Sequence, residues 1–240
     1  MGSIRVASYN VAGFPWSMTN IRAIARWVNK SCDIVALQES WCRHSEWKSA
    51  FSQYGWSCVF PSREAHITGF FGSGLAFAYR MSDWELQDSR FYPFLATIGV
   101  DQLTVKGWFR IEAYHRRTGK LMRFLNTHMQ SDYEIYDELW RQLSEPIRIA
   151  QAVQITDVER RMPRLPTLML GDFNTETCWL PGCHFLSMNG APTFPRTQEM
   201  LDHCAVWNHH DWILINHHVD CVQLSDHYPS VWTVKNRGIR

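Results

Sequence analysis

The sequence has no apolar run long enough to span a bilayer, no internal repeat, no low-complexity tract and no long linker. A membrane-spanning helix needs about 20 consecutive apolar residues. A chain of 240 residues can bury about 70–75% of its unfolded surface, so its core needs no cross-links. We therefore expect one domain over residues 1–240.

A strong charge of either sign is also missing, because the formal net charge is only +1. Proteins that grip nucleic acid usually carry a basic patch, although small hydrolases can hold phosphate through a metal ion. The charge balance disfavours a nuclease only mildly.

The seven cysteines show no CxxC spacing. An odd number without that spacing argues against a complete disulfide framework and against a zinc site. We expect reduced thiols and a cytoplasmic or intracellular protein, while a Cys178–Cys183 bridge remains open. Strand-like alternation already begins at Ile4, and Val6 stands where a myristoylation signal needs Ser or Thr. Secretion after processing remains open.

Tryptophan, in contrast, is abundant, with 12 residues. Indole rings bury a large apolar area. We therefore expect the tryptophans to fill a core rather than to line a substrate groove.

Helical and strand-like periods alternate along the chain. Helices are predicted from residue 21, with Asn20 as the N-cap, and over residues 137–161, with an interruption at Pro146. A turn at Thr118-Gly119 joins two strands into a hairpin. The predicted strands cover residues 4–9, 33–37, 74–79, 105–114, 121–126, 167–170, 201–206, 212–215 and 228–234. Helices that cover mixed strands indicate an α/β layered sandwich.

Polar side chains recur where these apolar strands end. They are Asn10, Glu39, His128, Asp172, Asn174, Asp226 and His227. Strand ends at one edge of a sheet direct side chains toward a common crevice. Each residue alone could be a turn or cap residue or, for His128, a hydrogen-bonded core histidine, but the combination is far more specific.

The set supplies carboxylates, carboxamides and imidazoles. Hard oxygen ligands suit Mg²⁺, or Mn²⁺ in its place. A metal ion next to a phosphate polarises the phosphoryl oxygens, and an imidazole can take a proton from the attacking water. The chemistry predicted is metal-assisted hydrolysis of a phosphoester.

The motifs in which these residues stand cover the chain almost end to end. They are Ser8-Tyr9-Asn10, Leu37-Gln38-Glu39, Asn126-Thr127-His128, Gly171-Asp172-Phe173-Asn174 and Ser225-Asp226-His227. In this order they resemble the signature motifs of the endonuclease/exonuclease/phosphatase (deoxyribonuclease I-like) superfamily. The resemblance implies a four-layer α/β sandwich with two central mixed β-sheets flanked by helices.

The resemblance also implies a Mg²⁺ site. Glu39 would be the main ligand, with Asn10 and Asp226 close to the metal. Asp172 and Asn174 would contact the attacking water, the phosphate or a second metal ion.

For proton transfer, the resemblance implies His227 as general base and His128 as a donor to the phosphoryl oxygens. The segment that begins Leu201-Asp202 is similar to the family strand whose aspartate orients the base. The family often has an aromatic residue after that aspartate, whereas this sequence has His203.

Short segments resemble the sphingomyelinase branch in particular. They are Lys106-Gly107-Trp108, His128-Met129-Gln130 and Ser225-Asp226-His227-Tyr228-Pro229. By this resemblance Lys106, together with His128 and Asn174, would bind substrate.

Three functions remain open. The first is a sphingomyelin phosphodiesterase, the second a Mg²⁺-dependent nuclease or nucleotide phosphodiesterase, and the third a binding module on an inactive enzyme fold. The expected partner is a phosphodiester, either a sphingolipid head group or nucleic acid, and we expect a monomer. Peripheral membrane contact through Phe70-Phe71 or Trp212-Ile213-Leu214-Ile215 is open, although buried strands are the commoner context for such residues.

Overall fold

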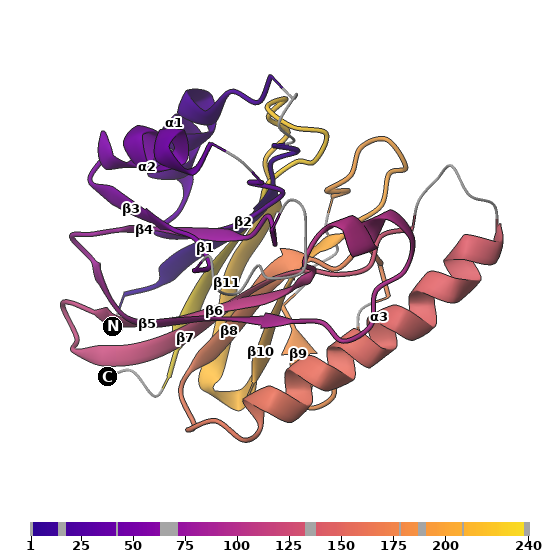
Figure 1. Ribbon diagram of the computed structural model, residues 1–240. Coiled ribbons are helices and arrows are strands. Elements are labelled where there is room, and N and C mark those ends of the chain that lie inside the picture. Colours follow the sequence, from indigo (N-terminus) through magenta and orange to yellow (C-terminus); the bar gives the residue numbers. More distant parts are fainter. Residues whose placement is uncertain are drawn as a thin grey trace.

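The structure is a computed structural model that describes residues 2–13, 18–41, 43–62, 72–132, 138–177, 179–186, 191–207 and 209–237. Within this part of the chain, two six-stranded sheets pack face to face between helical layers (Figure 1). The expected four-layer α/β sandwich is therefore confirmed.

The first sheet has the strand order β11-β12-β1-β2-β4-β3. Only β1 and β2 run parallel, and the other neighbours are antiparallel. Its strands are β1 (Ile4–Asn10), β2 (Ile34–Gln38), β3 (Trp56–Val59), β4 (Ala76–Arg80), β11 (Trp212–Val219) and β12 (Ser230–Asn236).

The second sheet has the order β5-β6-β7-β8-β10-β9, and here β7 and β8 form the parallel pair. Its strands are β5 (Trp84–Pro93), β6 (Gly107–His115), β7 (Lys120–His128), β8 (Thr167–Asp172), β9 (Cys183–Phe185) and β10 (Asp202–Trp207). In both sheets, the two parallel strands thus end at the same edge of the sandwich.

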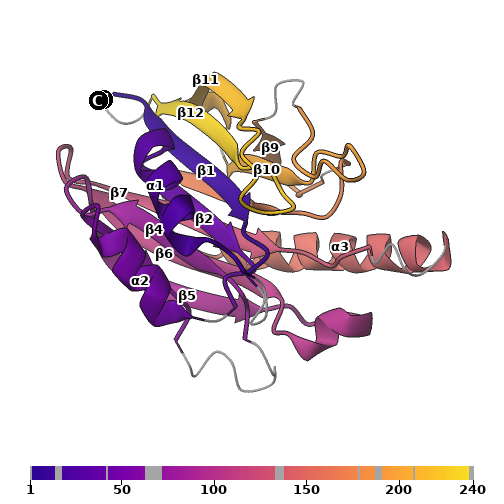
Figure 2. The ribbon, with the colours of Figure 1, turned by 90° about the horizontal axis from the view of Figure 1, so that it is seen from above.

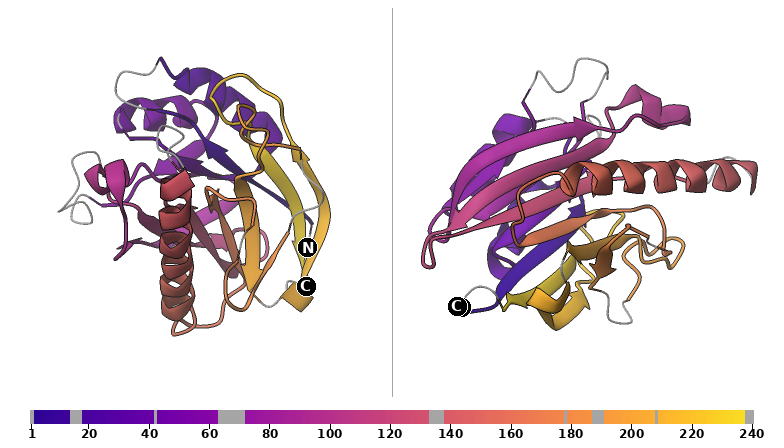
Figure 3. Two further views of the ribbon diagram at one scale, coloured as in Figure 1. Left: turned by 90° about the vertical axis from the view of Figure 1, so that its right-hand side faces the viewer. Right: turned by 90° about the horizontal axis from the view of Figure 1, so that it is seen from below.

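Helices cover both outer faces. Figure 2 shows α1 (Ile21–Ser31) and α2 (His44–Ser52) over the first sheet, and α3 (Glu138–Glu159) runs along the second sheet in Figure 3. The 3-10 turns η2 (Gly99–Leu103) and η3 (His209–Asp211) lie in connections. None of the helices within the described ranges is long and apolar enough to cross a membrane.

Three apolar clusters hold the layers together. One lies between the sheets, where Phe77 and Phe109 have ring centroids 5.8 Å apart. The other two lie under α1 with α2 and under α3. Tryptophan fills these cores as expected, since Trp47, Trp56, Trp84, Trp108 and Trp232 are fully buried.

The predicted elements are largely present, and the Asn20 cap is confirmed because its side chain accepts from the Ala23 N–H. The interruption predicted at Pro146 is wrong, because α3 continues through it. Downstream residues such as Ala152 and Ile155 pack against the second sheet, and this packing offsets the hydrogen bond that proline cannot make. The sequence reading missed α2, β3, β5 and β9, which are short, weakly periodic or exposed.

Candidate active site

Strand register brings three predicted residues together in the second sheet. His128 at the end of β7 is the register partner of Asp172 at the end of β8, which is in turn the partner of Asp202 at the start of β10. The preceding Gly171 allows this close approach, because a Cβ there would lie 2.3 Å from the carbonyl oxygen of Thr127. All three side chains are buried.

The first sheet contributes residues that follow its parallel pair. Asn10 ends β1 opposite Gln38, and Glu39 follows with a φ of 57°. A left-handed conformation is strained for a non-glycine residue, and strain of this kind tends to cluster at functional sites. The amide Nδ2 of Asn10 donates to Glu39 Oε1 and to Asp172 Oδ2, at 3.0 Å each. Asn10 therefore links the two sheets.

His227 lies between two carboxylates. Its Nδ1 is 2.9 Å from Asp202 Oδ2, and its Nε2 is 3.7 Å from Asp172 Oδ2. The ring of Phe194 packs against it with centroids 4.8 Å apart. Burial alone would lower the pKa of His227, but the charges of Asp202 and Asp172 outweigh it and raise the pKa to about 10.

The pKa values of Asp172 and His128 are also shifted, each in the direction that its surroundings favour. Burial, aided by the charge of Asp202, raises the pKa of Asp172 to about 6, while His227 and the amide of Asn10 oppose the rise. Burial, together with the charges of Lys106 and His227, holds the pKa of His128 well below its usual value. A neutral imidazole can still donate through Nε2, which lies 3.7 Å from Asp172 Oδ2.

Residues without a predicted role support the Asp202 carboxylate. The hydroxyl of Ser8 lies 3.3 Å from Asp202 Oδ1 and 3.4 Å from Gln38 Oε1. The Gln38 Nε2 then donates to Asn126 Oδ1 at 2.7 Å. Ser8, Gln38 and Asn126 belong to the motifs named in the sequence analysis, so these motifs could have indicated that the three residues are part of the site.

Thr193 and Phe194 gave no signal in the sequence. The hydroxyl oxygen of Thr193 accepts from the backbone N–H groups of Leu201 and Asp202, at 2.9 and 3.0 Å. Both residues come from an irregular connection, where no period marks a buried side chain.

The predicted substrate-binding residues are engaged within the protein. Lys106 Nζ donates to the carbonyl of Met129 at 2.9 Å and pairs with Asp101 at 3.2 Å, and its side chain is only 1% exposed. A Cβ on the adjacent Gly107 would lie 2.2 Å from a backbone oxygen. Asn174 donates through Nδ2 to the same Met129 carbonyl at 3.0 Å. The roles of Lys106 and Asn174 toward substrate stay predictions.

Asp226 is connected to Asn10 through Ser225. Its Oδ1 lies 3.1 Å from the hydroxyl of Ser225, which also contacts the Asn10 carbonyl at 2.8 Å. The side chain of Asp226 is exposed. The structure thus joins Glu39 to Asn10 directly, and Asp226 only through Ser225.

The carboxylates of Glu39 and Asp172, which meet at the Asn10 amide, fit a hard cation. No group of three His, Cys, Asp or Glu side chains with ligand geometry occurs in the described part of the chain. Mg²⁺ does not need one, because it typically binds through one or two carboxylates and keeps several waters. The two carboxylates that flank the Asn10 amide supply such a set, whereas Zn²⁺ would favour nitrogen and sulfur ligands.

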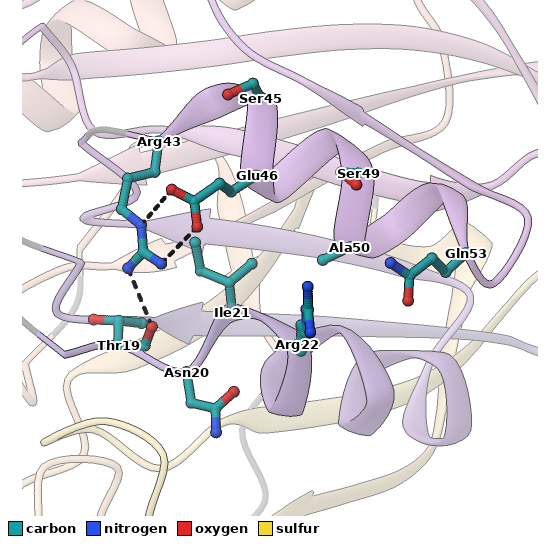
Figure 4. A pocket seen from close by; sticks show the side chains of 10 residues that line it. All are labelled: Thr19, Asn20, Ile21, Arg22, Arg43, Ser45, Glu46, Ser49, Ala50 and Gln53. Carbon is teal, nitrogen blue, oxygen red and sulfur yellow. Dashed lines mark hydrogen bonds and ion pairs between the residues drawn. The ribbon is translucent and has the colours of Figure 1, made fainter.

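A separate hollow of ≈ 540 Å³ lies between α1 and α2 (Figure 4). Arg43 projects into it and donates to Glu46 at 2.7 and 2.9 Å and to the carbonyl of Thr19 at 3.4 Å. None of the candidate catalytic residues lines this hollow.

Comparison with known proteins gives a family match over residues 7–227, to the model described as the endonuclease/exonuclease/phosphatase family. The sequence has no significant match among curated proteins.

Solved structures share the fold over nearly the whole chain. SmcL has 19% identity and a TM-score of 0.77, with 98% of this chain and 99% of that chain covered. A mutant beta toxin from Staphylococcus aureus with bound magnesium ions has 16% identity and a TM-score of 0.77, with 96% and 99% covered. The human Nocturnin catalytic domain with bound sulfate has 17% identity and a TM-score of 0.71, with 98% and 94% covered. At such identities the similarity concerns the fold.

Proposed function

Because the chain belongs to the endonuclease/exonuclease/phosphatase family, we propose that it is a Mg²⁺-dependent phosphodiesterase and that its substrate is sphingomyelin. One observation carries the catalytic part of this proposal. The Asp202–His227 pair, at 2.9 Å, is connected through Asp172 and Asn10 to Glu39. His128 Nε2 lies 3.7 Å from the same Asp172 carboxylate, so the residues that we propose as base, as donor to the phosphate and as cation ligands are neighbours.

In the proposed mechanism, the neutral form of His227 takes a proton from the attacking water through Nε2 while Asp202 holds the ring through Nδ1. Because the pKa of His227 is about 10 in the metal-free protein, the positive charge of the bound cation would have to lower it for this form to be present near neutral pH. The water oxygen bonds to phosphorus, the bond from phosphorus to the ceramide oxygen breaks, and the leaving oxygen takes a proton from solvent, so that phosphocholine and ceramide are released. His128 donates from its neutral ring to the phosphoryl oxygens as charge builds there. Mg²⁺ held by Glu39 and Asn10, with Asp226 near it, would polarise the phosphoryl group and neutralise charge on the leaving oxygen.

The choice of sphingomyelin is supported by the sphingomyelinase-like motifs, by the similarity to SmcL and beta toxin, and by the near-zero net charge. Peripheral membrane contact is part of this proposal. Val100 and Leu103 on η2 are 44% and 56% exposed. The turn adjoins the site because its Asp101 accepts from the backbone of Ser131 at 2.9 Å.

Two other segments were considered above for membrane contact. Phe70 and Phe71 lie outside the described residues. Trp212 is 6% exposed and Ile215 is 51% exposed, and β11 is an edge strand of the first sheet.

The test is a comparison of substrates at equal enzyme concentration with Mg²⁺. We expect phosphocholine release from sphingomyelin in mixed micelles to be faster than cleavage of plasmid DNA, single-stranded RNA or inositol phosphates. Nicking of plasmid at trace enzyme without phosphocholine release would favour the nuclease alternative. No turnover of any of these by folded protein would favour a binding module.

We also propose a monomer, and we propose a cytoplasmic or intracellular setting because the odd number of cysteines shows no CxxC spacing; Cys178, the other half of the bridge left open above, lies outside the described residues. Sedimentation velocity tests the first point, since a concentration-dependent dimer would contradict it. Recovery of the native protein with oxidised cysteines would contradict the second.

A further inference from the structure

His203 follows Asp202 on β10 and lies on the opposite face of the second sheet, because successive side chains of a strand alternate between the faces. Asp202 faces the first sheet, where Ser8 contacts it. The ring of His203 packs edge to face against Phe173 and Phe185, with centroids 5.7 and 5.9 Å apart, and is only 4% exposed. An apolar aromatic side chain would pack equally well, so this packing does not account for a histidine.

The contacts of the His203 ring show its protonation state. Nε2 lies 2.9 Å from the carbonyl oxygen of Thr175. A carbonyl oxygen can only accept, so Nε2 carries the hydrogen and donates it. Burial lowers the pKa of His203, although the Thr175 carbonyl opposes the shift, so the ring is neutral near neutral pH. A neutral imidazole has one N–H, and His203 uses it on Thr175.

The segment of residues 172–175 leaves β8 in the candidate site and is anchored twice beside β10. The N–H of Phe173 donates to the carbonyl of Leu201 at 2.9 Å. Next comes Asn174, which has a left-handed φ of 52°. The Nε2–H of His203 then anchors the segment again at its last residue. A strained conformation persists only where its surroundings hold it, and the two anchors stand on either side of the strained residue.

This segment sets the orientation of the Asp172 carboxylate. Asp172 Oδ1 accepts from the backbone N–H of Asn174 at 2.9 Å. The other oxygen, Oδ2, accepts from the Asn10 amide at 3.0 Å and lies 3.7 Å from the Nε2 atoms of His128 and His227. If Asn174 relaxed, its N–H would move and the carboxylate would turn away from these partners.

We propose that His203 is a positioning residue of the candidate active site. Its Nε2–H holds the Thr175 carbonyl and keeps Asn174 in its left-handed conformation. The carboxylate of Asp172 is thereby directed toward Asn10. His203 acts through this backbone segment and not on the substrate, and only the kinetic test of its role rests on the proposed function.

The kinetic experiment compares variants of the full chain with the wild type, on the substrate that the wild type hydrolyses fastest. His203→Phe keeps the ring packing but removes the N–H. It should lower kcat at least about tenfold while KM changes less, because contacts that orient a site are typically worth about 10–100-fold. His203→Gln keeps an N–H donor and should recover most of the lost kcat.

His115→Phe is the matched control. The His115 ring is also buried and packs edge to face, on Trp84 with centroids 5.0 Å apart. It ends β6, whereas Gly107 at the start of β6 is the register partner of His128, so it lies far from the site. This variant should leave kcat unchanged. A wild-type kcat in His203→Phe, or no recovery in His203→Gln, would overturn the positioning role.

A second measurement needs no substrate. Long-range proton–nitrogen NMR spectra of histidine-labelled protein distinguish the tautomers, and we expect the neutral Nε2–H form for His203. The backbone amide resonance of Asn174 should shift in His203→Phe and stay in place in His203→Gln and His115→Phe. An Nδ1–H tautomer, a charged ring or an unshifted Asn174 amide would overturn the proposal. If the NMR results hold but no phosphodiester is hydrolysed, the proposed function fails and the positioning of Asp172 stands.

Discussion

His227 Nδ1 lies 2.9 Å from Asp202 Oδ2, a contact between two residues 25 positions apart in the sequence. Asp202 begins β10 in the second sheet, whereas His227 precedes β12 in the first. The pair therefore forms only when the sheets pack together, and it couples the chemistry of the site to the integrity of the sandwich.

The first prediction concerns this pair. His227→Ala should lower turnover about 10²–10⁴-fold because it removes the general base. Asp202→Asn should lower turnover too, and it should move the acid limb of the pH–rate profile to lower pH, because the charge of Asp202 raises the pKa of His227. A double-mutant cycle, with folding checked by circular dichroism, measures the two losses of turnover and their coupling. Residues that act as a unit give non-additive losses, so strictly additive losses would contradict the pairing.

The second prediction concerns stability in the absence of divalent metal. The pKa of His227 rises from an unfolded value of about 6.5 to about 10 in the folded protein. Its contribution is therefore fully present below pH 6.5 or so and is lost as the pH rises through about 10. Thermal melts in EDTA should show this decline, and Asp202→Asn should flatten it, because the folded pKa falls. If the melting temperature fell equally with pH in the wild type and in Asp202→Asn, His227 would not be the source of the decline.

The third prediction concerns the cation. Glu39→Gln should raise the Mg²⁺ concentration for half-maximal activity at least about tenfold, since even outer-shell changes cost about 10–100-fold in affinity. Glu46→Gln is the matched control, because the Glu46 carboxylate lies on α2 and pairs with Arg43 just before that helix. Activity at several Mg²⁺ concentrations measures the effect. Full activity after exhaustive chelation would eliminate the metal mechanism.

The fourth prediction concerns Asn126, which is fully buried and bridges the sheets. Its Nδ2 donates to the carbonyls of Leu37 and Ala76, at 2.8 Å each. Asn126→Leu should lower the free energy of unfolding by about 2–4 kcal/mol, because buried partners lose their bonds. Urea unfolding measures the loss. Thr127→Val, which removes one hydrogen bond, should cost less, and equal costs would argue against the bridge.

The fifth prediction concerns the thiols. Cys32, Cys58 and Cys204 are buried, and burial raises the pKa of each. Only thiolates react readily with iodoacetamide, so these residues should be alkylated only after unfolding. Cys221 is exposed and should react in the native protein. Peptide mapping by mass spectrometry measures the alkylation of each cysteine. Equal labelling of all four in the native protein would contradict the burial of the first three.

The elements with a clear period or end signal were predictable from the sequence. The apolar alternation of β1, the Asn20 cap of α1 and the Thr118-Gly119 hairpin depend on neighbouring residues, so the chain specifies them locally. Polar residues at strand ends were predictable for the same reason, because each is recognised from the apolar strand that directly precedes it. The motifs of the site could therefore be recognised in order.

Contacts that cross the sandwich could not be predicted, because no period links residues far apart in the sequence. Only the packing of the sheets places Ser8 beside Asp202 and directs Asn10 to both Glu39 and Asp172. Packing likewise keeps α3 helical through Pro146, against its local preference. It also buries Lys106 against Asp101, which the motif alone does not predict. The sequence by itself determined which chemical groups are present and at which strand ends. The tertiary structure decided which of them meet, because burial and charge act through space.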